Sequence, residues 1–339
     1  MQVAVIGAGR VGGAVINELA RNESIDYLGI MDRDLEKSRG LLADLINANP
    51  AYQKKLFTGP YEWAADADIV VLCAGIAQNK GQSREELINQ NLKITTEILS
   101  QIKFKPSAKL IVVTNPVDTI SLNAMRVSGL PPQQVVGFGG DLDTLRLKQI
   151  LEHVSRLEHA SGKEVKSFDA NVKFIKSVNA HVIGGHGELA VSIYRDHPKD
   201  PNIGLSVREY AMAVIERNGA TMFGPSAKIG ELVDDIIHDK KRLHHVSYFN
   251  KDEKVFLTWP CIIGKVGVIK TVELSLNEDE KTELRKVIAH LKELDEKKIR
   301  PEFAKAVGKL TQKIDENTTK KTEVNLIDDV AKKKSIKVN

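Results

Sequence analysis

The stretch VAVIGAGRVG, residues 3–12, decides the fold of this 339-residue chain. Its beginning is an apolar run, which is typical of a buried parallel strand. Gly7, Gly9 and Gly12 follow with the spacing G-x-G-x-x-G, and an amphipathic stretch predicts a helix over 11–20. In such a unit the first glycine permits a tight turn, the second leaves the backbone bare for a pyrophosphate, and the third lets the helix pack closely on the strand. The stretch therefore predicts a dinucleotide-binding unit, with the phosphates on the N–H groups that begin the helix.

An acidic residue follows the second predicted strand. The apolar run 27–31 predicts that strand, and Asp32 stands at its end, 20 residues beyond Gly12. A carboxylate there can accept hydrogen bonds from the ribose hydroxyls of an adenosine, and it repels a 2′-phosphate. The strand, the helix and the acid together favour a cofactor site over a purely structural glycine turn, and they favour NAD over NADP.

Apolar runs alternate with helical periodicity through the rest of the first half. Buried strands are predicted at 69–73, 110–113 and 135–137, and helices over 35–48, 85–102 and 119–127. Such alternation indicates an α/β fold with a doubly wound parallel sheet, a Rossmann domain over residues 1–140.

The second half has a mixed pattern, which indicates an α+β substrate or catalytic domain over residues 141–339. Helices are predicted over 143–157, 205–218, 226–237 and 278–293, and strands at 244–249, 255–258 and 266–274. Residues 160–173 show no clear periodicity, and 196–201 is typical of a charged loop. From about residue 297 the chain is a Lys-rich extension.

The composition narrows the class of protein. Hydrophobic residues make up 42% of the chain, enough for a large core, and the formal net charge of +4 does not suggest a nucleic-acid partner. Cys73 and Cys261 stand in apolar surroundings and are expected to be buried thiols rather than a disulfide, which fits a reducing compartment. No apolar run approaches about 18 residues, and no signal sequence precedes the first strand. We therefore expect a cytoplasmic protein with no membrane partner.

Taken together, the motifs resemble those of one family, the lactate and malate dehydrogenases with the related L-2-hydroxyacid dehydrogenases. The matching segments stand in the family order and run through most of residues 1 to about 295. They are GAGRVG at 7–12, AG at 74–75 with the loop to 84, TNPV at 114–117, DTLR at 143–146, GHG at 185–187, GAT at 219–221 and PCIIG at 260–264.

The resemblance implies catalytic roles for His186, Asp143 and Arg84, and it implies that Arg146 binds the substrate. His186 would be the general acid and base, because the pKa of histidine lies near neutrality, and Asp143 would fix its tautomer. Arg146, three residues after Asp143 on one helix face, would grip the substrate carboxylate with its planar fork. Arg84, at the end of the polar loop 78–84, would swing in on closure and stabilise the developing alkoxide. Without the resemblance, a solvated surface charge is the favoured explanation for both arginines, and a turn histidine is the alternative for His186.

The resemblance also implies a set of contacts with NAD at the carboxyl ends of the predicted strands. The set consists of Gly7, Gly9, Val11, Gly12, Asp32, Ala74, Gly75, Asn91, Val113 and Asn115. Asn115 is similar to the family asparagine that positions the nicotinamide and the substrate, and the Asn115–Pro116 bond is a candidate for the cis form. No metal site is expected: His238, His244 and His245 match no ligand spacing, so a solvated or capping role is predicted for them.

Two positions indicate the substrate. Gln78 stands six residues before Arg84, where malate dehydrogenases typically carry an arginine for the second carboxylate and lactate dehydrogenases carry glutamine. A neutral amide cannot neutralise a buried second carboxylate. Thr221 is similar to the threonine beside the substrate side chain in lactate dehydrogenases. Both favour a monocarboxylate such as pyruvate.

Departures from the family pattern keep alternatives open. Gly185 stands where glutamate is usual, Pro225 where a branched apolar residue is usual, and the connection from Arg146 to His186 is long. An L-2-hydroxyisocaproate-type or a malate dehydrogenase therefore remains an alternative, as does, from a different class, a catalytically silent NAD-binding regulatory protein. The family implies a homodimer or a homotetramer.

Activation by a sugar bisphosphate is expected to be absent. Many bacterial lactate dehydrogenases bind fructose 1,6-bisphosphate through an arginine and a histidine at a subunit interface, and here these positions are Lys148 and Asn179. Asn179 carries no charge for a phosphate. We predict that the half-saturating concentration of pyruvate does not change when the sugar bisphosphate is added. A lower half-saturating concentration would contradict this.

Overall fold

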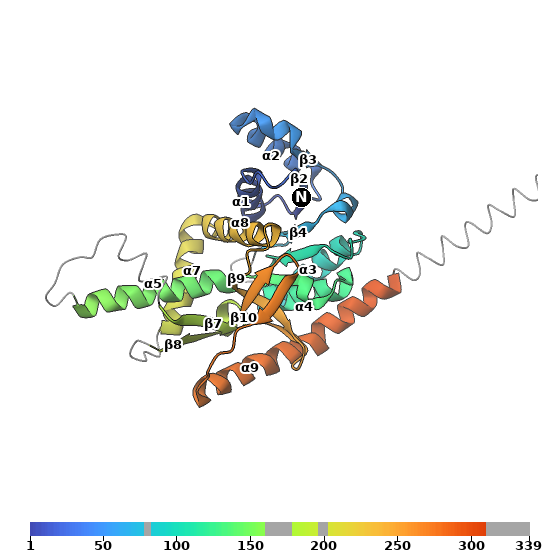
Figure 1. Ribbon diagram of the computed structural model, residues 1–339. Helices are drawn as coiled ribbons and strands as arrows, with labels where there is room; N and C mark the ends of the chain where they lie inside the picture. The colour runs from blue at the N-terminus through green and yellow to red at the C-terminus, as the bar shows by residue number, and fades with distance from the viewer. Residues whose placement is uncertain (78–82, 160–177, 196–202, 310–339) are drawn as a thin grey trace, which may run out of the picture.

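The computed structural model of the chain describes residues 1–77, 83–159, 178–195 and 203–309. These residues form one eleven-stranded sheet covered by helices (Figure 1). The strand order is β3-β2-β1-β4-β5-β6-β9-β10-β7-β8, and β11 pairs with β10 beside this path. The predicted loop 196–201 and the aperiodic segment 160–173 lie outside the described residues.

The first six strands in this order are parallel, as the sequence predicts. They are β3 (Leu56–Thr58), β2 (Tyr27–Met31), β1 (Gln2–Ile6), β4 (Ile69–Leu72), β5 (Lys109–Val112) and β6 (Val135–Phe138). The strand β3 was not predicted, because three residues carry too little periodicity to separate a strand from a turn. The helices that connect these strands are α1 (Arg10–Ala20), α2 (Leu35–Ala48), α3 (Arg84–Leu99) and α4 (Val117–Ser128).

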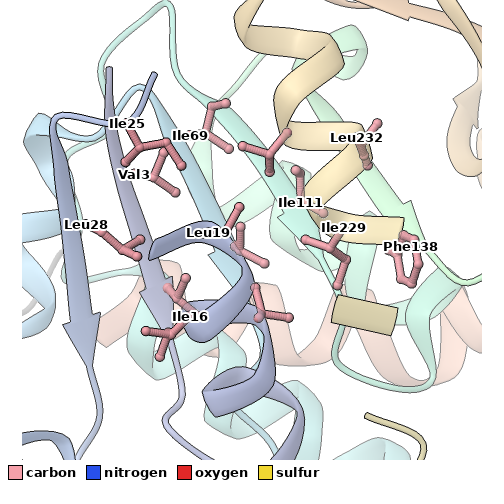
Figure 2. Packing of buried hydrophobic residues seen from close by; sticks show 14 of the residues in the cluster. Val3, Ile16, Leu19, Ile25, Leu28, Ile69, Ile111, Phe138, Ile229 and Leu232 are labelled. Carbon is pink, nitrogen blue, oxygen red and sulfur yellow. The ribbon is translucent and has the colours of Figure 1, made fainter. Parts of the chain in front are cut away.

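Alternate residues of the parallel strands enter two separate apolar cores, because successive side chains of a strand point to opposite faces. On one face Val3 and Ile69 pack in one cluster with Ile16 of α1 and Ile229 of α8 (Phe223–Ile237) (Figure 2). The other face buries Ile6, Leu72 and Val112 with residues of α3 and α4. Helices on both faces explain why the strands are almost continuously apolar rather than alternating.

The second half extends the same sheet with antiparallel strands. They are β7 (Ala180–Gly184), β8 (Ala190–Tyr194), β9 (Arg242–Asn250), β10 (Val255–Gly264) and β11 (Gly267–Thr271). The junction is β6 against β9, which pair antiparallel through Gly137–Ser247 and Phe138–Val246. The remaining long helices are α5 (Gly140–His159), α7 (Ile203–Asn218) and α9 (Glu278–Leu294). The short strands β7 and β8 were not predicted.

The chain continues as helix beyond α9. A π-helical turn spans Asp295–Ile299, and α-helix follows over 300–309. Asp295 is buried and pairs with Arg126 of α4, with Nη2 to Oδ2 at 2.9 Å, so this part of the Lys-rich extension is anchored to the first half. Residues 310–339 of the extension lie outside the described residues.

Two further sequence expectations bear on the class of protein. Cys73 and Cys261 are free thiols, as predicted, and Cys261 is buried. In the part of the chain that the structure describes, no helix combines the length and apolarity that a membrane span requires.

The glycine-rich turn is the most constrained point of the first half. A Cβ on Gly12 would lie 1.8 Å from the carbonyl oxygen of Gly7. Gly12→Ala is therefore expected to lower the free energy of unfolding by about 1–3 kcal/mol, measured by urea denaturation. The matched control is Gly40→Ala in α2, where the added Cβ would meet no described atom within 4 Å other than its chain neighbours and the adjacent backbone of its own helix. This control should gain about 0.5–1 kcal/mol, because alanine favours a helix interior. Equal midpoints for wild type and Gly12→Ala would contradict the close approach.

Candidate active site

Of the three glycines in the glycine-rich loop, only Gly9 has open space beside its Cα. Gly7 has φ +101°, and a Cβ there would lie 2.6 Å from the Ala74 nitrogen, while Gly12 abuts the Gly7 carbonyl. By contrast, among the described atoms none lies within 4 Å of a Cβ built on Gly9, which is exposed at the start of α1. The backbone N–H groups beside Gly9 are therefore accessible to an anion.

Asp32 lies next to this loop at the end of β2. Its Oδ2 accepts a hydrogen bond from the Ala8 N–H at 2.7 Å, and its Oδ1 accepts from the Asp34 N–H at 3.0 Å. The Lys37 Nζ lies 3.9 Å from Oδ2. Because each carboxylate oxygen can accept more than one hydrogen bond, acceptor capacity remains for hydroxyl groups of a ligand.

The ends of β4 and β5 are tied together by the buried side chains of Asn91 and Thr114. The Asn91 amide donates to the carbonyls of Ile76 (3.1 Å) and Asn115 (2.7 Å), and its Oδ1 accepts from the Ile76 N–H (2.8 Å). The Thr114 hydroxyl lies 2.8 Å from the carbonyl oxygen of Ala74. Asn91 therefore braces this edge with both of its N–H groups already used. Thr114 was not singled out from the sequence.

The other predicted cofactor residues lie around this edge. Val11 is half-buried in the first turn of α1, Ala74 and Val113 are half-buried just after β4 and β5, and Gly75 and Asn115 are exposed. A Cβ on Gly75 would lie 2.6 Å from the Thr114 Cγ2. The Asn115–Pro116 bond is cis.

His186 and Asp143 lie together, although 43 residues separate them in the sequence. The His186 Nδ1 is 2.7 Å from the Asp143 Oδ2, and the Asp143 Oδ1 accepts from the Arg146 Nη1 at 3.0 Å. Asp143 and Arg146 are 3% and 9% exposed, so Arg146 is not a solvated helix charge. A ring nitrogen facing a carboxylate carries a proton, so Nε2 is the ring atom left for a ligand.

Burial and charge act in opposite directions on the pKa values of this pair. Burial lowers the pKa of His186, but the charge of Asp143 and its hydrogen bond outweigh burial and raise that pKa above its usual value. Burial raises the pKa of Asp143, but His186 and Arg146 more than offset this and lower it. The imidazolium form of His186 is therefore stabilised, as a proton donor to substrate requires.

A second carboxylate holds the backbone of His186. Asp118 is 5% exposed, and its Oδ2 accepts from the His186 N–H at 2.9 Å. Its Oδ1 accepts from the Ser247 hydroxyl on β9 at 2.6 Å. Asp118 directly follows the sequence match at 114–117, but nothing in its spacing indicates a partner 68 residues away.

Glycine also permits the close approach of α5 to the histidine ring. A Cβ on Gly139 would lie 2.6 Å from the His186 Nδ1, and one on Gly140 would lie 2.3 Å from the Thr258 Cγ2. Gly139 and Gly140 were not singled out from the sequence, because the need for glycine arises from contacts with His186, just after β7, and with Thr258 on β10.

The remaining predicted substrate residues are placed less completely. The Thr221 hydroxyl oxygen is buried and has no hydrogen-bond partner among the described residues. The backbone of Arg84 begins α3, and its side chain and Gln78 lie outside what the structure describes. Gly185 is buried, and a Cβ there would lie 2.4 Å from the Leu189 Cβ. Pro225 is buried in the first turn of α8.

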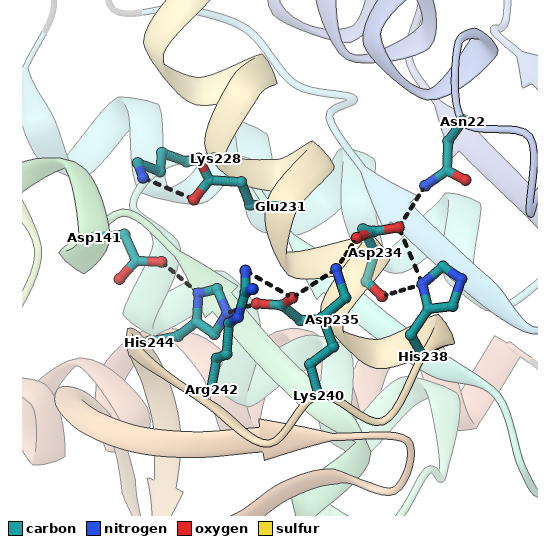
Figure 3. Close-up of polar contacts among 10 residues, drawn as sticks. All are labelled: Asn22, Asp141, Lys228, Glu231, Asp234, Asp235, His238, Lys240, Arg242 and His244. Carbon is teal, nitrogen blue, oxygen red and sulfur yellow. Dashed lines mark hydrogen bonds and ion pairs between the residues drawn. The ribbon is translucent and has the colours of Figure 1, made fainter.

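The predicted solvated role for His244 and His245 is wrong. They are 4% and 6% exposed, and both contact Asp141 in the first turn of α5 (Figure 3 shows His244). Local alternation on a strand could not reveal a carboxylate supplied by a distant helix. His238, with a side chain 43% exposed, does lie near the surface beside Asp234. Within the described ranges, no group of three or more suitable side chains could hold a metal ion.

Comparison with known proteins matches both halves of the chain. The family model for the lactate/malate dehydrogenase NAD-binding domain matches residues 1–137, and the model for the α/β C-terminal domain of the same family matches residues 141–302. Malate dehydrogenase of Geobacillus thermodenitrificans is 31% identical over 315 residues, covering 86% of this chain and 96% of that protein. L-lactate dehydrogenase of Thermus aquaticus is 31% identical over 319 residues, covering 86% and 97%.

Solved structures match to a similar extent. A lactate dehydrogenase from a deep-sea metagenome library has a TM-score of 0.73 at 27% identity, over 87% of this chain and 98% of that chain. The malate dehydrogenase of Aeropyrum pernix has a TM-score of 0.73 at 27% identity, over 87% and 97%. Because both domains of the family are matched in order along the chain, the chain belongs to the lactate/malate dehydrogenase family and is an NAD-dependent oxidoreductase of 2-hydroxy acids.

Proposed function

We propose that the chain is an L-lactate dehydrogenase, which reduces pyruvate to L-lactate with NADH. The observation that carries the chemistry is the contact of His186 with Asp143, with Arg146 on the other carboxylate oxygen. Gln78 and the unpartnered buried hydroxyl of Thr221 support a monocarboxylate, because neither residue neutralises a second carboxylate.

The residues present fit the dinucleotide. Gly9 faces open space at the start of α1, and Asp32 retains acceptor capacity beside it. Reduced NAD supplies the hydride when it is bound. We assign the contacts with it to the predicted residues at the ends of β1, β2, β4 and β5, with Asn91 acting through the backbone that it braces.

The chain's own groups handle the proton and the charge. Arg146 binds the substrate carboxylate through its guanidinium, which is already oriented by Asp143. His186 donates its Nε2 proton to the carbonyl oxygen, and Asp143 stabilises the imidazolium before transfer and fixes the tautomer afterwards. Arg84, carried by the start of α3, stabilises the developing alkoxide in the closed site.

A malate dehydrogenase is the second candidate, and one contact favours it. The exposed Arg10 lies against Gly219, two residues before Thr221, where a Cβ would lie 2.1 Å from the Arg10 Nη1. This guanidinium could pair with the second carboxylate of oxaloacetate. A relative named malate dehydrogenase is as similar to this chain as the one named L-lactate dehydrogenase.

We further propose that residues 1–140 form the NAD-binding domain and residues 141–339 the catalytic domain. We also propose that the chain forms a homodimer or a homotetramer and that it is cytoplasmic. The exposed apolar residues of α7, among them Leu205, Tyr210 and Met212, support an interface between subunits. The two free thiols support a reducing compartment.

The substrate is tested by measuring NADH oxidation with pyruvate, oxaloacetate and 2-oxo-4-methylpentanoate in parallel. We expect the highest kcat/KM with pyruvate. Gln78→Arg should shift the preference toward oxaloacetate by about 10²-fold or more, because it adds a cation for the second carboxylate. The matched control is Gln82→Arg, which adds the same charge elsewhere in the loop. A wild-type preference for oxaloacetate would favour the Arg10 alternative, and one for the branched acid would favour a hydroxyisocaproate-type enzyme.

The raised pKa of His186 predicts the pH dependence of reduction. Pyruvate reduction needs the protonated ring, so kcat/KM should fall as the pH rises through a midpoint above about 6.5. Asp143→Asn removes the charge that raises this pKa, so the midpoint should move to lower pH and kcat/KM at pH 7 should fall by about 10²- to 10⁴-fold. Asp26→Asn, at an exposed carboxylate, is the control. An unchanged midpoint in Asp143→Asn would contradict the assignment.

A further inference from the structure

The first turn of α5 carries two carboxylates that contact different histidines. Asp143 contacts His186, whereas Asp141 contacts His244 and His245 on β9. The Asp141 Oδ2 is 2.8 Å from the His244 Nδ1, and the Asp141 Oδ1 accepts from the His245 N–H at 2.6 Å. One helical turn therefore links the candidate active site to a second histidine cluster.

His244 lies between two carboxylates. Its Nε2 is 3.0 Å from the Asp235 Oδ2 on α8, opposite the contact with Asp141 (Figure 3). The side chains of His244 and Asp235 are 6% and 2% exposed. A carboxylate accepts hydrogen bonds and a neutral imidazole has only one N–H, so both contacts are satisfied only by the imidazolium.

The surrounding charges favour that cation. Burial lowers the pKa of His244, but Asp141 and then Asp235 outweigh burial and raise it. Lys240 and Arg242 face the other oxygen of Asp235, at 3.5 and 3.4 Å, and so balance its charge.

Two neighbouring titratable side chains, His181 and Cys261, are neutral at pH 7. The His245 Nε2 contacts the His181 Nδ1 at 2.8 Å. Burial, and then the charges of His245, Lys148 and Arg195, lower the pKa of His181 to about 4, so this ring is neutral. Cys261, paired with His244 across β9 and β10, is also neutral, because burial raises its pKa to about 12.

We propose that the His244 imidazolium is a positioning residue that holds the first turn of α5 against α8 and β9, and thereby sets Asp143 against His186. The three elements that meet at His244 carry the groups around the candidate acid. The helix α5 carries Asp143, β9 carries Ser247, which bonds Asp118 behind His186, and α8 begins two residues after Thr221. Loss of the cation removes the charged partner of Asp141 and its link to Asp235, and so frees this turn to shift.

The inference rests on the proposed role of His186, and two variants test it. His244→Gln removes the charge at similar length, and Asp235→Asn removes one of the two carboxylates while keeping the shape. The matched control is His238→Gln, which breaks the exposed contact between His238 and Asp234 at the end of α8. Each variant is assayed for kcat with pyruvate, for KM for NADH, and for the pH midpoint of kcat/KM.

We expect kcat of His244→Gln to fall about tenfold or more, because small displacements of reacting groups are costly. Its pH midpoint should fall, because Asp143 then stabilises the His186 imidazolium less. KM for NADH should stay within about twofold, since the ring of His244 contacts Asp141 on α5 and Asp235 on α8 and not the glycine-rich loop. Asp235→Asn should also lower kcat and the pH midpoint, but by less than His244→Gln does. Variants with the kcat and pH midpoint of His238→Gln would overturn the proposal.

A second measurement does not depend on turnover. Long-range ¹⁵N–¹H spectra of the wild-type histidines report the protonation of each ring. The His244 signal is assigned as the one that His244→Gln lacks and His238→Gln keeps. His244 should stay doubly protonated above the ordinary histidine pKa of about 6.5. A neutral His244 at that pH overturns the proposal whether or not pyruvate is the substrate, so its failure is distinct from that of the proposed function.

Discussion

The position of Asp143 is the constraint on which the site depends. One carboxylate group joins the proposed acid, His186, to the proposed carboxylate anchor, Arg146. Burying an unpaired carboxylate is costly in free energy, so His186 and Arg146 also stabilise the buried Asp143 anion. The sheet makes this possible, because β6 leads directly into α5 while β7 brings His186 from the far side of β9 and β10. Gly139 gives the room that the ring of His186 needs.

The two halves of the chain differ in how much of their fold the sequence predicts. In the first half every strand except β3, and every long helix, carries its own periodicity, and the glycine spacing sets the turn between β1 and α1. The short strands β3, β7 and β8 were missed because their pairing depends on neighbours rather than on local pattern. The antiparallel extension from β6 through β9 was not predicted, since the order of strands in a sheet is set by long-range contacts.

The site shows the same limit more sharply. The resemblance brought together Asp143 and His186, which no spacing argument could do across 43 residues. Asp118, Thr114 and the pair Gly139–Gly140 were missed, because their roles lie in contacts with other elements. The prediction for His244 and His245 failed for the same reason. The negative charges that allow the His244 imidazolium to be buried come from Asp141 on α5 and Asp235 on α8.

The central claim is that Arg146, Asp143 and His186 form one substrate site. A crystal structure of the chain with NADH and oxamate, an isostere of pyruvate with an amide in place of the methyl group, tests this most directly. We expect the oxamate carboxylate to lie on the Arg146 guanidinium, and its carbonyl oxygen to lie within hydrogen-bond distance of the His186 Nε2. Oxamate bound elsewhere, or bound with its carbonyl turned away from His186, would contradict the account.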